Sequence, residues 1–163
     1  MTVENAHLFT PLTLRGVTAP NRIWISPMCQ YSVFKEDGVA TDWHMVHLGS
    51  RAAGGAGLII VEATAVEARG RISARDLGLW NEAQAEALAP IVSFMAEHGS
   101  VPVIQLAHAG RKAAVPGAIA PSAVAFEKMN MPQEMGAAEI EAVVAAFERS
   151  TRLALQAGFQ GVE

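Results

Sequence analysis

Four short apolar runs without polar alternation most constrain what this chain can fold into. They occupy residues 22 to 26, 57 to 61, 101 to 106 and 158 to 163, and most are rich in β-branched side chains. Strands that are covered on both faces show such continuous apolarity, whereas half-exposed strands alternate. The runs therefore predict the buried strands of a parallel sheet.

Helical patterns separate these runs. We expect helices over residues 42 to 53, from about 81 or 90 to 98, and over 137 to 157. Asp42 is the candidate N-cap of the first, and Gly158 is placed to end the third. Pro90 either opens the second helix or kinks a helix that begins near Asn81. Strand and helix thus alternate, which is typical of a sheet built from βαβ units.

The strand starts lie further apart than a minimal βαβ unit of roughly 30 residues requires. Some loops between strand and helix must therefore be long, and residues 113 to 136 read as a loop with several prolines and glycines. In α/β barrels, the loops at the carboxyl ends of the strands carry the chemistry.

Charge and cysteine content exclude several classes of function. The sequence has 12 Lys and Arg against 16 Asp and Glu, a formal net charge of −4, so neither nucleic acid nor an anionic membrane is an expected partner. One cysteine forms no internal disulfide, and the start lacks a signal-peptide pattern, so we expect a cytoplasmic location. The apolar runs are far shorter than the roughly 20 residues of a membrane span.

Distinctive polar or small residues follow the predicted strands. Ser26, Pro27, Met28 and Cys29 follow the first run, Glu62, Ala63 and Thr64 the second, and Gln105 and His108 lie at the third. The carboxyl ends of parallel strands meet on one face, so residues distant in sequence are expected to line one pocket there.

Each of these residues also has a structural interpretation. Cys29 alone fits an inert buried thiol, and Tyr31 fits an amphipathic residue at a loop edge. The Gln105 amide lies in an apolar strand and needs hydrogen-bond partners, of which a ligand is one source. His108 and Arg111 fit either a site or a structural loop network.

Two other patterns carry no functional prediction. His44 and His47 have helical spacing for a metal, but no third ligand is spaced to join them, so we expect packing or surface roles and no metal. The glycines at 54 to 57 follow a helix and precede a strand, which reverses the order of a dinucleotide fingerprint.

Taken together, the motifs resemble the old yellow enzyme family of flavin-dependent ene-reductases, in its bacterial subgroup with a cysteine in the first-strand loop. The similarity runs in order from Leu8 to Glu163, through LFTPLTLRGVTAPNRI, SPMCQYS, TDWHMVHLGSRAAGGAGLIIVEATAV, GRIS, VIQLAHAGRKA, APSAVAF and AGFQGVE. The short loop after Lys112 also fits that subgroup.

The resemblance implies a (β/α)8 TIM barrel with FMN at the carboxyl ends of the strands. It also implies an N-terminal hairpin, here residues 8 to 22, that closes the other end. A generic barrel needs about 250 residues. The 163 residues are thus expected to form a partial FMN-binding domain, 1 to 163: the hairpin, strands one to three and the start of strand four.

The resemblance also assigns roles. Ser26, Pro27, Met28 and Cys29 would run along the flavin, the Ala63 main-chain amide would approach its carbonyl edge, and Gln105 would bond its pyrimidine edge. Cys29 would modulate the flavin potential, and Tyr31 would hydrogen-bond the substrate carbonyl.

The implied reaction transfers hydride from NADPH through FMN to an enone or enal. The family's proton-donating tyrosine lies beyond strand four, so we expect residues 1 to 163 alone to be inactive and to need a C-terminal half, in a homo-oligomer when complete. An alternative is a non-catalytic half-barrel that self-associates or complements a C-terminal fragment. A dienoyl-CoA reductase or an amine dehydrogenase remains open within the same chemistry.

Overall fold

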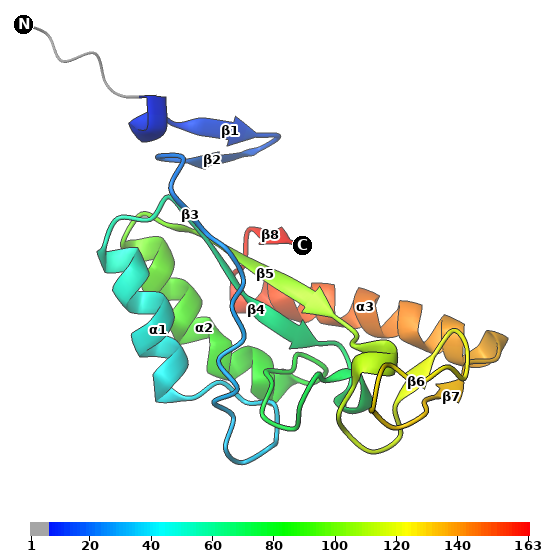
Figure 1. Cartoon of the computed structure of the whole chain (residues 1–163). Helices are drawn as coiled ribbons and strands as arrows, with labels where there is room; N and C mark the ends of the chain where they lie inside the picture. Colours follow the sequence, from blue (N-terminus) through cyan, green and yellow to red (C-terminus); the bar gives the residue numbers. More distant parts are fainter. Residues whose placement is uncertain (1–6) are drawn as a thin grey trace, which may run out of the picture.

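A four-stranded parallel sheet forms the centre of the molecule (Figure 1). The structure is a computed structural model and describes residues 7–163. The strands lie in the order β3 (Trp24–Ile25), β4 (Leu58–Ala65), β5 (Val101–Ala107) and β8 (Gly161–Val162). Each neighbouring pair is parallel. The parallel sheet predicted from the apolar runs is therefore confirmed.

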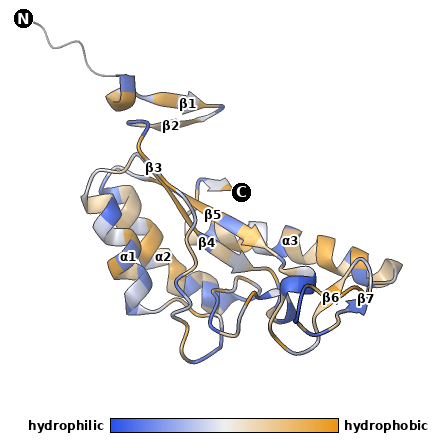
Figure 2. Cartoon of the chain, viewed as in Figure 1, coloured by the Kyte–Doolittle hydropathy of each residue, from blue (hydrophilic) through white to orange (hydrophobic). Residues whose placement is uncertain are grey.

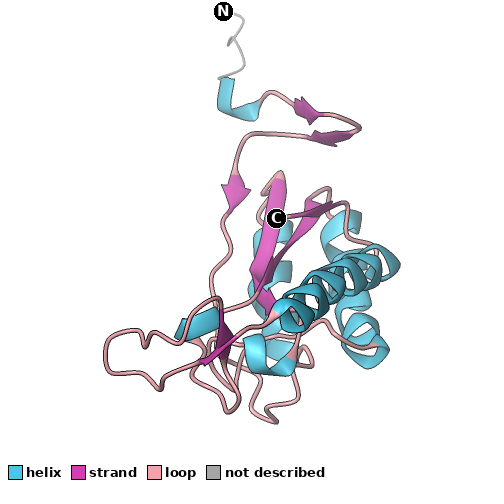
Figure 3. Cartoon of the chain, turned by 90° about the vertical axis from the view of Figure 1, so that its right-hand side faces the viewer, coloured by secondary structure: helices cyan, strands magenta, loops and turns pink. Residues whose placement is uncertain are grey.

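Three helices cover one face of this sheet (Figures 1 and 3). They are α1 (Asp42–Ala53), α2 (Glu82–Glu97) and α3 (Ala137–Ala157), and their positions confirm the predicted helices. The other face is open, with half-buried side chains. The fold is thus an α/β half-barrel whose open face corresponds to a barrel interior.

Two helix starts refine the sequence interpretation. The N-cap of α1 is Thr41 and not Asp42, because Thr41 is extended and its N–H donates to Nδ1 of His44 at 3.0 Å. Helix α2 starts after Asn81, whose Oδ1 accepts from the Gln84 N–H at 3.1 Å. Pro90 therefore lies inside a longer helix and does not open one.

The hydrophobic core fills the space between the sheet and the helices. It contains Ile59, Val61 and Ile104 from the strands, and Leu48, Leu88, Met95 and Leu153 from the helices, all less than 9% exposed. Burial of each such aliphatic side chain stabilises the fold by about 1.5–3 kcal/mol. Among residues 7–163, no helix combines the length and apolarity that crossing a bilayer requires.

An N-terminal hairpin lies at the amino ends of the strands. After η1 (His7–Phe9), β1 (Leu12–Leu14) pairs antiparallel with β2 (Val17–Ala19). Ala19 packs in a small apolar cluster with Leu58 and Val101, the first residues of β4 and β5. This confirms the predicted hairpin and its place at one end of the sheet. Figure 2 shows hydrophobic residues in β1.

Long loops gather at the opposite, carboxyl end of the strands (Figure 3). They include η2 (Ala68–Gly70) and η3 (Gly110–Lys112). The segment 113 to 136 was predicted to be a loop throughout. The structure differs, because this segment contains the parallel pair β6 (Ile119–Ala120) and β7 (Gln133–Glu134). Both residues of β6 are buried, and this packing supplies the reason for the pairing.

Strand β4 contains a bulge that changes which side chains face the helices. Val61 pairs with Ile104, but the next pairing joins Thr64 to Leu106, so β4 has one residue too many. A bulge re-aims the side chains at its position. Consecutive Val61 and Glu62 are both buried, and Ala63 is half-buried. The bulge therefore directs the Glu62 carboxylate towards α1 and Ala63 towards the open face.

Candidate functional site

The segment after β3 runs along the carboxyl rim of the sheet and carries four predicted site residues. Ser26 and Met28 are exposed, the latter by 41%, whereas Pro27 and Cys29 are half-buried. The segment has no regular secondary structure, so its main-chain groups are not committed to a ladder. It can therefore offer backbone contacts to a ligand on the open face.

Two groups, one from β4 and one from the segment of Cys29 itself, meet at the Cys29 sulfur. The Ala63 main-chain amide and the Tyr31 hydroxyl both donate towards it. Burial, followed by the charges of Glu62 and Asp76, raises the pKa of the thiol, and the two hydrogen bonds oppose this rise without cancelling it. Cys29 is therefore a protonated thiol at neutral pH, which is a weak nucleophile and a weak hydrogen-bond donor.

Tyr31 is held in an unusual backbone conformation. Its φ of 51° lies in the left-handed region, which costs a residue other than glycine about 1–3 kcal/mol and persists where the surroundings fix it. The side chain is 46% exposed at the rim. The neighbouring Cys29, followed by burial, raises the pKa of the phenol, so Tyr31 stays protonated and can donate a hydrogen bond.

Gln105 lies on the open face of β5, opposite the bulge of β4. The register places Ile104 beside Val61 and Leu106 beside Thr64, so Gln105 faces the stretch that contains Ala63. Its Nε2 donates to Oε1 of exposed Glu163 at 3.4 Å. Cys29, Ala63 and Gln105 thus share one rim, which is the arrangement that the sequence predicted.

His108 belongs to a structural clamp between two rim loops. Its Nδ1 accepts from the Gly110 N–H at 3.1 Å, so the ring proton is on Nε2, which donates to Oε1 of Glu67 at 2.9 Å. A Cβ on Gly70 would lie 2.7 Å from the His108 ring, so the loops touch closely. The loop-network interpretation of His108 is therefore the correct one.

Arg111 lies outside this clamp. Its guanidinium and the ammonium of Lys112 lie over the ring of Phe126, 5.6 and 4.4 Å from its centroid. These contacts tie η3 to the loop that follows β6 through cation–π attraction.

The two histidines of α1 are both buried. His44 and His47 are 1% and 8% exposed, and residues 7–163 contain no group of three or more His, Cys, Asp or Glu side chains placed for a metal. Both side chains are therefore packed inside the fold.

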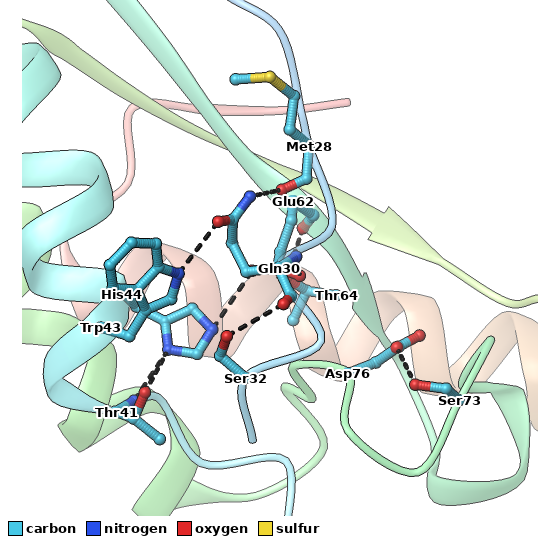
Figure 4. A network of polar contacts seen from close by, with 10 residues as sticks. All are labelled: Met28, Gln30, Ser32, Thr41, Trp43, His44, Glu62, Thr64, Ser73 and Asp76. Carbon is cyan, nitrogen blue, oxygen red and sulfur yellow. Dashed lines mark hydrogen bonds and ion pairs between the residues drawn. The ribbon is translucent and has the colours of Figure 1, made fainter. Parts of the chain in front are cut away.

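A network of polar contacts that was not predicted from the sequence supports the Cys29 segment (Figure 4). The Gln30 N–H donates to Oε2 of Glu62 at 2.8 Å, and Trp43 Nε1 donates to Oε1 of Gln30 at 3.0 Å. His44 Nε2 lies 3.2 Å from Oε1 of Glu62. Glu62 was the sequence signal that could have predicted this network. It is a carboxylate within the apolar run GLIIVEATA, and a buried carboxylate must find polar partners.

The parallel sheet, its covering helices and the hairpin at its amino end define one half of an α/β barrel. A sequence profile of the NADH:flavin oxidoreductase / NADH oxidase family matches residues 7–163. The chain belongs to this family, within its old yellow enzyme branch, and FMN is the cofactor that the family uses.

Three similar proteins illustrate the relationship. An NADPH dehydrogenase of a Geobacillus species is 53% identical over 158 residues, which cover 96% of this chain and 46% of that protein. Morphinone reductase in complex with tetrahydroNAD is 29% identical with a TM-score of 0.86, over 97% of this chain and 48% of its own. An old yellow enzyme homologue from Zymomonas mobilis is 30% identical with a TM-score of 0.84, over 96% and 47%.

The lengths of these proteins can be compared with the length of the chain. It spans about half the length of the curated relatives that it matches. The solved barrels are covered to the same extent. The described fold therefore corresponds to one half of their barrels.

Proposed function

We propose that this chain forms part of a flavin-dependent ene-reductase, which reduces the C=C bond of α,β-unsaturated carbonyl compounds with hydride from NADPH through FMN. The observation that carries this proposal is the convergence of Cys29, Tyr31, Ala63 and Gln105 on one rim of the sheet. The family membership supplies the cofactor, and the similarity to NADPH dehydrogenases supports the electron donor.

The chemistry of the rim fits an isoalloxazine ring. The pyrimidine edge of a flavin shows one N–H donor between two carbonyl acceptors, and a carboxamide such as Gln105 offers the matching acceptor and donor. The Ala63 amide lies on the neighbouring strand and supplies a further donor. Ser26, Pro27, Met28 and Cys29 would hold the ring from the adjoining segment.

The chemistry that a bound FMN would supply is hydride transfer from NADPH to the β-carbon of the alkene. Negative charge then develops on the substrate carbonyl oxygen. Tyr31 would donate a hydrogen bond to that oxygen, because its phenol stays protonated and its side chain is exposed at the rim. A donor placed where charge develops lowers the barrier of the chemical step.

Cys29 would act on the cofactor and not as a nucleophile. Burial and the Glu62 charge keep its thiol protonated, so it presents a soft, weak donor to the flavin. A reducing compartment such as the cytoplasm keeps this thiol free, as the role requires.

Residues 1 to 163 would form one part of the FMN-binding barrel domain, and a second part of comparable length would complete it. This partition is supported by coverage of about half of each relative. We place the group that protonates the α-carbon of the substrate in that second part, because no described residue at the rim other than Tyr31 offers a phenol.

The test uses the purified complete protein, in which the second part is present and FMN is bound. It follows the reduction of FMN by NADPH and the reoxidation of FMN by cyclohexenone separately. We expect NADPH to bleach the flavin and the enone to restore its colour. Tyr31→Phe should lower the enone half-reaction about tenfold or more, since a hydrogen bond to a charged group contributes about 1.5–3 kcal/mol. The NADPH half-reaction of the same variant is the internal control. Absence of enone-dependent reoxidation would overturn the proposal.

A further inference from the structure

The carboxylate of Glu62 is a buried charge that the proposed reaction does not use. Its residue is 4% exposed and lies in the middle of the sheet. Burying a carboxylate is costly unless it is paired and hydrogen-bonded. Both oxygens have a neighbour, since Oε2 accepts from the Gln30 N–H at 2.8 Å and Oε1 lies 3.2 Å from His44 Nε2.

The protonation of His44 follows from its other contact. The Thr41 N–H donates to Nδ1 of His44 at 3.0 Å, and a ring nitrogen that accepts a hydrogen bond carries no proton. The ring proton is therefore on Nε2 and faces Glu62, although the alignment of the two falls short of a regular hydrogen bond. The Nε2–H of His44 therefore orients the Glu62 carboxylate from the side of α1.

Gln30 is fixed at both its peptide and its side chain. Besides the bond to Glu62, its carbonyl accepts from Ser32 Oγ at 3.0 Å and its Oε1 accepts from Trp43 Nε1 at 3.0 Å. Its Nε2 donates to the Met28 carbonyl at 2.7 Å. The bonds with Glu62 and Trp43 tie the loop to β4 and α1, and the bonds with Met28 and Ser32 lie within the loop, as Figure 4 shows.

The two residues on either side of Gln30 are Cys29 and Tyr31. Tyr31 has the left-handed φ of 51°, a conformation that needs external support. The hydrogen bonds of Gln30 supply that support from two separate elements of the fold. We call Gln30, Trp43, His44 and Glu62 the rim support.

We propose that Glu62, oriented by His44, is a positioning residue of this site. Through the Gln30 peptide it sets the place of the Cys29 thiol and of the strained Tyr31. This inference rests on the proposed function for what the positioned groups do, but the positioning itself concerns only residues described above.

The first test uses the pH dependence of Cys29 alkylation by iodoacetamide in the purified protein. Cys29 is the only cysteine of residues 1 to 163, and its alkylation is read at the Cys29 peptide by mass spectrometry. The charged groups acting on its thiol are Glu62 of β4 and Asp76 of the following loop, and the neutral Tyr31 phenol acts through a hydrogen bond. Glu62→Gln removes one of these charges and sets an NH2 group against one of two donors, Gln30 N–H or His44 Nε2–H.

We expect Glu62→Gln to move the alkylation midpoint to lower pH and to reduce kcat/KM for cyclohexenone. Glu67→Gln is the matched control. It removes another partly buried carboxylate that follows the same strand but does not act on Cys29, so its alkylation profile should equal that of the wild type. Equal profiles and equal enone kinetics in folded Glu62→Gln and wild-type protein would overturn the inference.

A second variant tests the rim support without a buried substitution. Trp43 is 47% exposed, so Trp43→Phe removes its bond to Gln30 and leaves the core intact. We expect kcat/KM for the enone to fall several-fold while NADPH reduces the flavin at the wild-type rate. Trp24→Phe is the control, because it removes an indole bond to the Asn21 carbonyl at the other end of the sheet.

The outcomes separate this inference from the proposed function. If Glu62→Gln does not fold, Trp43→Phe decides: wild-type enone kinetics overturn the inference, and a selective loss supports it. If the wild-type protein reduces no enone while Trp43→Phe, which removes no charge, shifts the Cys29 profile, the proposed function fails and the positioning of the loop stands.

Discussion

At the scale of single residues, Gln105 offers the sharpest test of cofactor binding. Gln105→Glu keeps the shape of the side chain but removes its N–H donor and adds a charge. We expect FMN binding to weaken about tenfold or more, since an unmet hydrogen-bonding group costs about 1–3 kcal/mol. Quenching of flavin fluorescence measures the dissociation constant.

Gln160→Glu is the control for this substitution. Gln160 is exposed and precedes β8 at the amino end of the sheet, so the same new charge lies far from the rim. Equal dissociation constants for Gln105→Glu and the control would remove Gln105 from the binding site.

Glu67 makes stability depend on pH through the clamp with His108. Burial alone would raise the pKa of this carboxyl, but hydrogen bonds from Arg69 and His108 outweigh it, and the pKa is lowered. The stabilisation is therefore present above the ordinary glutamate range of about pH 4 to 5 and is lost as the pH falls through it. In Glu67→Gln, we expect a smaller difference in melting temperature between neutral pH and roughly pH 3.5.

The measurement is a series of thermal unfolding curves across this pH range. Glu86→Gln, an exposed glutamate on α2 with no ion pair among the described residues, is the matched control and should follow the wild-type curve. If the difference in melting temperature between neutral and acidic pH falls equally in both variants, the contact between Glu67 and His108 is not the cause of the pH dependence.

The sequence identified the residues whose type is unusual for their context. Cys29, Tyr31 and Gln105 stood out as a lone thiol, a lone phenol and an amide in an apolar strand, and the structure brings all three to one rim. Glu62 and His44 did not stand out as a pair. Their contact depends on the packing of α1 against β4 and on a one-residue bulge, and neither follows from local spacing.

At the scale of elements, the end of α3 depends on one backbone conformation. Gly158 caps the helix with φ of 98°, and a Cβ there would lie 3.2 Å from Val92 Cγ1 of α2. We expect Gly158→Ala to lower the free energy of unfolding by about 1 kcal/mol or more, because L-residues avoid this region. Chemical denaturation of the purified protein measures it.

Gly54 provides the comparison, since it caps α1 with φ of −75°. Alanine adopts that conformation without strain, so Gly54→Ala should change stability by only a few tenths of a kcal/mol, roughly. A similar loss in both variants would mean that backbone strain is not the cause.

The regular elements were the most predictable part of the fold. The helices followed from periodic apolar residues and the sheet from continuous apolar runs. The short pairs were not predictable: β3 contains only Trp24–Ile25 of the expected 22 to 26, and the pair β6 and β7 was missed. Two-residue strands are defined by their neighbours and not by their own sequence.

At the scale of the whole molecule, the open face determines what residues 1 to 163 can do by themselves. β3 and β8 each have one neighbour, and their Trp24 and Val162 are 38% and 41% exposed. Unpaired strand edges favour association with other chains. We expect the polypeptide of residues 1 to 163, produced alone, to bind FMN more weakly than micromolar and to self-associate.

Flavin titration and sedimentation measure these two properties. A monomer of 17.2 kDa that binds FMN with micromolar or tighter affinity would contradict the expectation. That result would mean that the rim residues of 1 to 163 make enough contacts to bind FMN without the second part of the barrel.

The bulge of β4 reverses which residues of the strand face the open side of the sheet. Before it, the residues that alternate towards the interior of the barrel fall in one phase, and after it they fall in the other. Deleting one residue there would restore simple alternation and exchange the destinations of the Glu62 and Ala63 positions. One inserted residue thus directs the Glu62 carboxylate to the helix side of the sheet and the Ala63 main-chain amide to the open face.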